Sequence, residues 1–166
     1  MADLVLIDSY EATGSVSSIE FTAIPDTFTD LAIYLSGRAD ATYGQVYYET
    51  YLIVNSVSGS GKDLYGNGSA AASTSSGEIR IWGVPSSAAT LDTFGNALIY
   101  IPNYASSTAY KSISIDSVSE NNATASMTAL AASIYSSNTP ITSLGLNPYL
   151  TGNFVQYSSA YLYGIK

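Results

Sequence analysis

Short stretches with apolar residues at every second position recur along this chain, and no stretch has the spacing of an amphipathic helix. Residues 110–118, for example, place Ile113 and Ile115 on one face of an expected strand. Parallel strands are usually joined by helical crossovers, so a chain without helices is confined to antiparallel sheets. The pattern therefore predicts an all-β protein.

The segment from Ile19 to Arg38 shows this alternation of apolar residues most clearly. Apolar residues alternate before and after a Pro-Asp turn, at Ile19, Phe21, Leu31, Ile33 and Leu35. Proline followed by aspartate favours a tight connection. We therefore predict a strand, a turn and a second strand, arranged as a hairpin.

Further strands are expected over residues 45–54, 78–82, 97–101, 110–118, 123–135, 141–146 and 159–165. Residues 45–54 carry apolar side chains on both faces, which predicts a central strand. Residues 123–135 are rich in alanine, as helices often are, but Ser and Thr interleave at every second position and favour a strand. Residues 55–77, rich in Ser, Gly, Ala and Asn, are expected to form a long loop.

Residues Leu4–Ile7 form a short, continuously apolar run. Two structures fit such a run: a sandwich strand buried on both faces, or a docking arm, formed by residues 1–8, that lies against another subunit. The run has no basic start and is too short for a signal peptide. No run reaches the roughly 18 apolar residues that span a bilayer, so no membrane contact is expected.

Eight to ten short strands without a substantial helix predict an antiparallel β-sandwich, formed by a single domain over residues 1–166. We expect a jelly-roll-like arrangement, with an immunoglobulin-like sandwich or a different barrel as the alternative. The chain has no repeat of fixed period, which argues against a solenoid or a propeller.

The composition excludes several classes of function. Charged residues make up 11% of the chain, and its 15 tyrosines, with Ser, Gly and Asn, suit a contact surface. The chain contains no cysteine and no histidine, which removes thiolate chemistry and the commonest general base and metal ligand. The net charge of −8, with five scattered Lys and Arg residues, argues against binding to nucleic acid.

Four short motifs suggest chemistry only weakly. The Gly59–Asp63 segment departs from a phosphate-binding loop, because Ser56 and Asp63 stand where that motif requires Gly and Ser or Thr. Residues 63–67 offer oxygen ligands but not the spacing of a calcium-binding loop. Asp26 and Asp30 are expected to cap turn backbone. For Arg38 we expect an ion pair or a hydrogen bond to a loop carbonyl, with an intersubunit contact as the alternative.

Several motifs resemble those of a family of small virion structural proteins of tailed bacteriophages, especially marine and cyanobacterial ones. Besides the Ile19–Arg38 segment, the matching stretches are Ile101–Tyr104 with Lys111–Ser114, Glu120–Thr124 with Ile141–Leu144, and Leu162–Lys166. The resemblance spans nearly the whole chain, and its motifs are structural rather than catalytic. It implies a virion component rather than an enzyme.

From this resemblance and the acidic charge we expect a non-enzymatic capsid decoration, or cement, protein on the outer capsid surface, bound to the major capsid protein or other virion proteins. Such a role is compatible with a homo-oligomer, a trimer first. No cofactor or metal is expected. The expected partner-binding residues are Leu4, Val5, Leu6, Ile7, Leu64, Tyr65 and Trp82. The alternative is a tail or fibre module whose Tyr and Trp82 side chains bind a host receptor or glycan.

Overall fold

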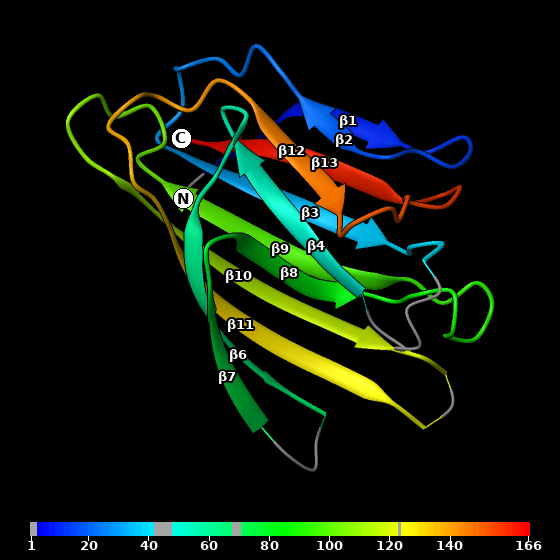
Figure 1. The fold of residues 1–166 in the computed structure, drawn as a ribbon. Helices are drawn as coiled ribbons and strands as arrows, with labels where there is room; N and C mark the ends of the chain where they lie inside the picture. Colours follow the sequence, from blue (N-terminus) through cyan, green and yellow to red (C-terminus); the bar gives the residue numbers. More distant parts are fainter. Residues whose placement is uncertain (1–2, 42–47, 68–70, 123) are drawn as a thin grey trace.

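The computed structural model describes residues 3–41, 48–67, 71–122 and 124–166, and within these ranges all regular structure is β-strand. The strands pair antiparallel in two sheets, which form a sandwich (Figure 1). The prediction of an all-β antiparallel sandwich is therefore confirmed, whereas the jelly-roll arrangement stays a prediction. None of the described residues belongs to a helix that could cross a lipid bilayer.

The larger sheet contains eight strands. In spatial order they are β1 (Leu4–Glu11), β13 (Ser159–Ile165), β3 (Asp30–Gly37), β9 (Gly95–Pro102), β10 (Lys111–Glu120), β11 (Ser126–Tyr135), β6 (Ser60–Gly66) and β7 (Ala71–Ser76). The smaller sheet contains β2 (Ile19–Phe21), β12 (Leu144–Pro148), β4 (Tyr48–Val54), β5 (Val57–Ser58) and β8 (Ile79–Val84). The described parts of the chain thus contain thirteen strands, against the eight to ten expected.

The Ile19–Arg38 segment contains the two predicted strands, but they do not pair as a hairpin. β2 belongs to the smaller sheet and β3 to the larger one, so the Pro-Asp turn carries the chain from one sheet to the other. The hydroxyl of Tyr104 donates a hydrogen bond to the carbonyl of Pro25 and accepts one from the N–H of Phe28, which holds this crossing in place. The apolar residues of both strands face one shared core.

The predicted strands at residues 110–118 and 123–135 form the longest hairpin, β10 with β11. Buried and exposed residues alternate strictly along both strands, so the choice of strand over helix for the alanine-rich segment is confirmed. β4 lies at the centre of the smaller sheet, as predicted, between β12 and β8. Residues 45–47 of that predicted strand lie outside the described residues.

The long loop predicted over residues 55–77 is wrong, because this stretch contains β5, β6 and β7. β6 pairs with β11, and β7 pairs with β6 at the end of the larger sheet. Residues such as Ser, Gly and Ala give little apolar alternation, and an edge strand needs little, since half of its side chains face solvent. These strands follow from pairing, of β6 with β11, of β7 with β6 and of β5 with β4, rather than from local sequence.

The two sheets approach each other closely at Gly83, in β8, and Gly95, in β9. A Cβ atom added to Gly95 would lie 2.0 Å from the carbonyl oxygen of Gly83. At the other end of the sandwich, Gly164 leaves room for the ring of Phe28, which would lie 2.3 Å from such an atom. These glycines are required because the neighbouring chain occupies the space of a side chain.

Two buried cations are held by backbone carbonyls instead of carboxylates. The guanidinium of Arg38 donates hydrogen bonds to the carbonyls of Ala89, Thr90 and Thr93 at 3.0, 2.8 and 3.1 Å. The predicted hydrogen bond from Arg38 to a loop carbonyl is therefore confirmed. The ammonium of Lys111 donates to the carbonyls of Ser106, Ser137 and Thr139. Each cation ties loops to the end of a strand.

Candidate interaction surface

The face of the larger sheet that points away from the smaller sheet carries an unusual number of exposed apolar side chains. Directly opposed residues of antiparallel strands project to the same face. One cross-strand row of such residues runs through all eight strands: Ser9, Tyr161, Tyr34, Leu98, Asp116, Leu130, Leu64 and Ser73. We call this side of the sheet the outward face. Asp116 is the one charged residue in the row.

The outward face divides into two chemically different halves. Over β10, β11 and β6 the exposed apolar side chains are aliphatic, and we call Leu64, Val118, Leu130 and Ile134 the aliphatic half. Leu64 and Leu130 are directly opposed, and each is 53% exposed. Asp116 lies opposite Leu130, and Lys62 lies two residues from Leu64 on β6. Glu120 lies two residues from Val118 on β10, so the aliphatic half is a small apolar patch with two negative charges and one positive charge beside it.

Over β13, β3 and β9 the outward face is lined by tyrosine. Tyr34 and Tyr161 are directly opposed, and Leu98 continues the row. The next row consists of Ser159, Ser36 and Asn96. Together with the backbone at Leu35 and Ala97 these residues line a groove of about 380 Å³, which we call the tyrosine groove. The outward face therefore offers an aliphatic patch and a mainly apolar groove with a few polar side chains in its lining.

The predicted site residues at the amino terminus form part of an edge strand. Leu4 and Leu6 lie opposite Ile165 and Tyr163 at the end of the outward face, Val5 points to the other side, and Ile7 occupies an irregularity between Leu6 and Asp8. Leu4, Val5 and Leu6 are all exposed, so the prediction of a strand buried on both faces is wrong. β1 pairs with β13 of its own sheet, which provides a fixed place for this run; docking on another subunit stays a prediction.

The three remaining predicted site residues are separated by the sheet. Leu64 belongs to the outward face, whereas Tyr65 projects to the opposite side and its ring stacks on Trp82, with ring centroids 4.9 Å apart. Trp82 is buried, and it packs with Met127 and Ala129. Trp82, expected from the sequence to bind a partner, is therefore part of a buried cluster, and its indole is not presented on the surface.

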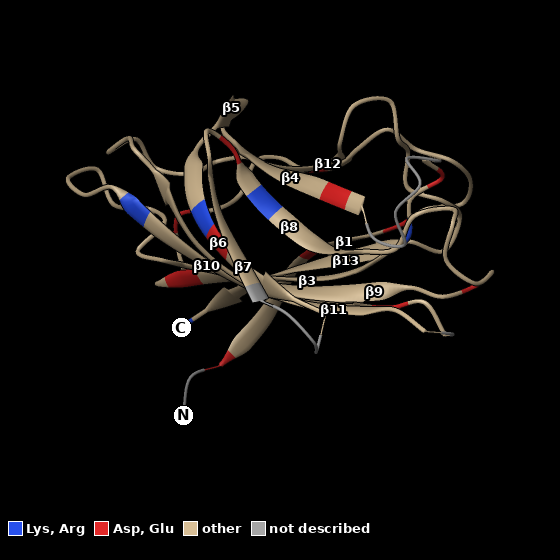
Figure 2. Cartoon of the chain, turned by 60° about the horizontal axis from the view of Figure 1, so that its bottom comes forward, with Lys and Arg blue, Asp and Glu red and all other residues tan. Residues whose placement is uncertain are grey.

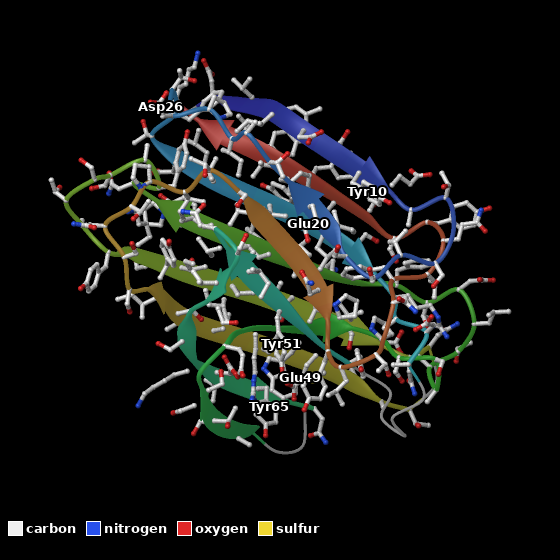
Figure 3. All side chains as sticks on the ribbon, turned by 45° about the horizontal axis from the view of Figure 1, so that its top comes forward. Tyr10, Glu20, Asp26, Glu49, Tyr51 and Tyr65 are labelled. Atoms are coloured by element: carbon white, nitrogen blue, oxygen red, sulfur yellow. The ribbon has the colours of Figure 1, made fainter. Side chains whose placement is uncertain are left out.

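A charged cluster lies next to this aromatic pair, between the smaller sheet and β6. Arg80 forms ion pairs with Glu49 at 3.5 Å and with Glu78 at 3.9 Å, and its guanidinium lies over the ring of Trp82. The hydroxyl of Tyr51 donates a hydrogen bond to Glu49, and Figure 3 labels both of these residues of β4 as well as Tyr65 of β6. Burial raises the pKa of Glu49, and Arg80 opposes part of that rise.

Asp63 is the most deeply buried carboxylate of this cluster. Neither of its oxygens has a hydrogen-bond partner of normal geometry among the described residues. Burial raises the pKa of Asp63, whereas the nearby Trp82 indole and the Arg80 guanidinium lower it. Because Arg80 already has Glu49 and Glu78 as partners, the ionised Asp63 is compensated incompletely.

We expect the Asp63→Asn variant to be more stable than the parent at pH 7, with a free energy of unfolding larger by about 1 kcal/mol. The substitution removes a buried charge that lacks hydrogen bonds. A raised carboxyl pKa means that the native state holds the proton more tightly than the unfolded state. The advantage of the variant should therefore shrink as pH falls through the raised pKa toward the ordinary value of 3.8. Chemical denaturation of both proteins at several pH values from about 4 to about 7 measures this difference in the free energy of unfolding.

The control is Asp116→Asn, on the outward face of β10, two strands away from β6, where the change should alter stability by less than about 0.5 kcal/mol at any of these pH values. If Asp63→Asn instead destabilises the protein at neutral pH, the Asp63 charge is a net stabilising partner of Arg80, and our account of the cluster is wrong.

The weakly suggestive motifs lie in strands or join neighbouring elements. Most of the Gly59–Asp63 segment lies in β6. Residues 63–66, which offered oxygen ligands for calcium, lie in the same strand. No group of three or more carboxylates that could hold a metal ion occurs among the described residues. Asp30 accepts hydrogen bonds from the hydroxyl of Tyr100 and the N–H of Asn103, so it joins β3 to β9 rather than capping its own turn.

Sequence reasoning missed most of the outward face. Tyr34, Leu98 and Leu130 lie in predicted strands, but their side chains alternate with buried residues that are equally apolar, such as Leu35 and Ala131. The signal that was available is the presence of apolar residues on both faces of β3 and β9. Comparison of the chain with protein-family models, curated proteins and solved structures gives no match to any of them.

Proposed function

We propose that this protein is a non-enzymatic structural component of a bacteriophage virion that binds the outer surface of the capsid shell. The aliphatic half of the outward face is the observation that carries the proposal. Large aliphatic side chains that stay exposed together on a rigid sheet mark an interaction site. A strand-built patch also needs little ordering when a partner covers it, which reduces the entropic cost of docking.

The partner we propose is the major capsid protein. Leu64 and Leu130 would supply the buried centre of the contact, while Asp116 and Lys62 would lie at its border and select a partner with opposite charges. Charged residues are sparse over the rest of the chain as well, as Figure 2 shows, and the net charge of −8 favours a position away from the genome. Repetition of one modest contact over an icosahedral shell adds up to a large stabilisation.

The first test is to locate the protein in intact particles by cryo-electron microscopy and to count its copies by quantitative mass spectrometry. Hundreds of copies on the icosahedral lattice are expected, and the oligomeric state, for which we propose a trimer, would be visible in the same maps. A few copies at the tail would contradict the capsid role and favour the alternative, a tail or fibre module that binds the host.

The second test is the substitution Leu130→Glu, which places a charge at the centre of the aliphatic half. We expect the amount of protein bound to particles to fall at least tenfold. A buried carboxylate without a partner would weaken the contact by about 3 kcal/mol or more. The matched control is Leu91→Glu, at a leucine that is 79% exposed and lies outside the larger sheet. Equal binding of the two variants would show that the shell contact lies elsewhere on the protein.

A further inference from the structure

The tyrosine groove has features that the aliphatic patch lacks. Its lining contains no charged side chain, and it presents two aromatic rings, one leucine and three small polar side chains. The ring of Tyr34 is held edge-to-face against Tyr163, with centroids 5.6 Å apart, so it is a supported surface rather than a loose side chain. A supported ring can bind a flat ligand without much loss of its own freedom.

The polar side chains of this groove are free of hydrogen bonds to the part of the chain that the structure describes. Among residues 3–41, 48–67, 71–122 and 124–166, no hydrogen-bond partner is found for the side chains of Tyr34, Ser36, Asn96, Ser159 and Tyr161. Each can donate and accept hydrogen bonds without carrying a charge. These uncharged donors and acceptors on a groove with aromatic walls define the chemistry of the ligand that would fit.

We propose that the tyrosine groove binds a neutral saccharide. A sugar ring has an apolar C–H face that can lie on the rings of Tyr34 or Tyr161, and its edge carries hydroxyls that can pair with Ser36, Asn96 and Ser159. The volume of about 380 Å³ lies within the usual range of small-molecule sites and accommodates one or two sugar rings. An anionic ligand is disfavoured by the absence of any cation in the lining and by the net charge of −8.

The saccharide proposal does not rest on capsid docking. The centre of the tyrosine groove, at β3, and the centre of the aliphatic half, at β11, are three strands apart. A twist of about 20–25° between neighbouring strands turns the two surfaces roughly 60–75° away from each other. The fanning of strand directions across the larger sheet is visible in Figure 1. A copy docked through Leu64 and Leu130 would therefore hold its groove at an angle to the docking contact, with Leu98 of the groove opposite Asp116 at the border of that contact.

The test uses the isolated, full chain and saturation-transfer NMR with a fixed set of probes: cellobiose, maltotriose, lactose and N,N′-diacetylchitobiose. We expect at least one to bind, with a Kd on the order of 1 mM, as befits a shallow site with few contacts. Tyr34→Ala and, separately, Ser36→Trp, which fills the groove, should each weaken that binding at least tenfold. The matched control Tyr157→Ala, at a tyrosine that is 65% exposed outside the groove, should leave it unchanged.

Thermal unfolding of each variant verifies that the fold is intact, and Tyr34→Phe adds a case in which the ring is kept while one hydroxyl is lost. Absence of binding for all four probes would overturn the proposal, as would binding that survives both groove substitutions. Phenol serves as a purely aromatic probe: if it saturates the groove and no saccharide does, the groove is a socket for a protein side chain instead. None of these results depends on whether the protein is found on a capsid.

Discussion

A Gly95→Ala variant is expected to lose at least about 3 kcal/mol of its free energy of unfolding, which makes it one of the most damaging single changes in this protein. The added methyl group would lie 2.0 Å from the carbonyl oxygen of Gly83 and 2.9 Å from the Cδ atom of Pro85. Both neighbours belong to the chain around β8, so relief requires the two sheets to separate. Separation would loosen the packing of the shared core on either side of the contact.

Chemical denaturation of the parent and the variant gives the difference directly. Gly14→Ala is the matched control, because an added Cβ atom there would have no heavy atom within 4 Å. The control should change stability by less than about 0.5 kcal/mol. Comparable stabilities of the two variants would show that the sheets can move apart at Gly95 without cost.

Replacement of Arg38 by alanine is expected to destabilise the protein by about 3–4 kcal/mol. The side chain is buried, and its guanidinium satisfies the carbonyls of Ala89, Thr90 and Thr93. Hydrogen bonds to a charged group are worth roughly 1.5–3 kcal/mol each, and buried carbonyls left without a donor add a further penalty. The loop over residues 86–93 should lose its order first, because this side chain joins it to the end of β3.

Arg38→Lys keeps the charge but not the planar set of guanidinium donors, because an ammonium is a compact point charge. We therefore expect it to lose less stability than Arg38→Ala but to remain less stable than the parent. Hydrogen exchange distinguishes a local role from a global one. Amides of residues 86–93 should exchange faster in both variants than in the parent, at denaturant concentrations where the parent remains folded. Unchanged protection of this loop would mean that Arg38 does not hold it.

Local patterns predicted the strands well wherever one face is buried. β10 and β11 were located from alternation alone, because a period of two leaves no other regular structure for a segment with Ile113 and Ile115 on one side. β6 and β7 were missed, since Ser, Gly and Ala carry no such period. The pairing of β2 and β3 was also wrong, because alternation shows that a strand exists but not which sheet contains it.

The candidate surface was predicted in part. Leu4, Leu6 and Leu64 were named from the sequence, and the structure places all three on the outward face. Tyr34 and Leu130 were not named, because an apolar residue in a strand gives no sign of whether its face meets a second sheet or solvent. That distinction depends on where β8 and β12 pack, which is a property of the whole chain.

The cross-strand row on the outward face also has an evolutionary consequence. Its central members contact solvent on one side, so substitutions there cost the fold little, typically within about 0.5 kcal/mol. Gly83, Gly95 and Arg38, by contrast, leave almost no room for change. Proteins with this fold can therefore change the residues of the outward face one at a time, and with them the partner that is bound, without losing the stability on which selection acts.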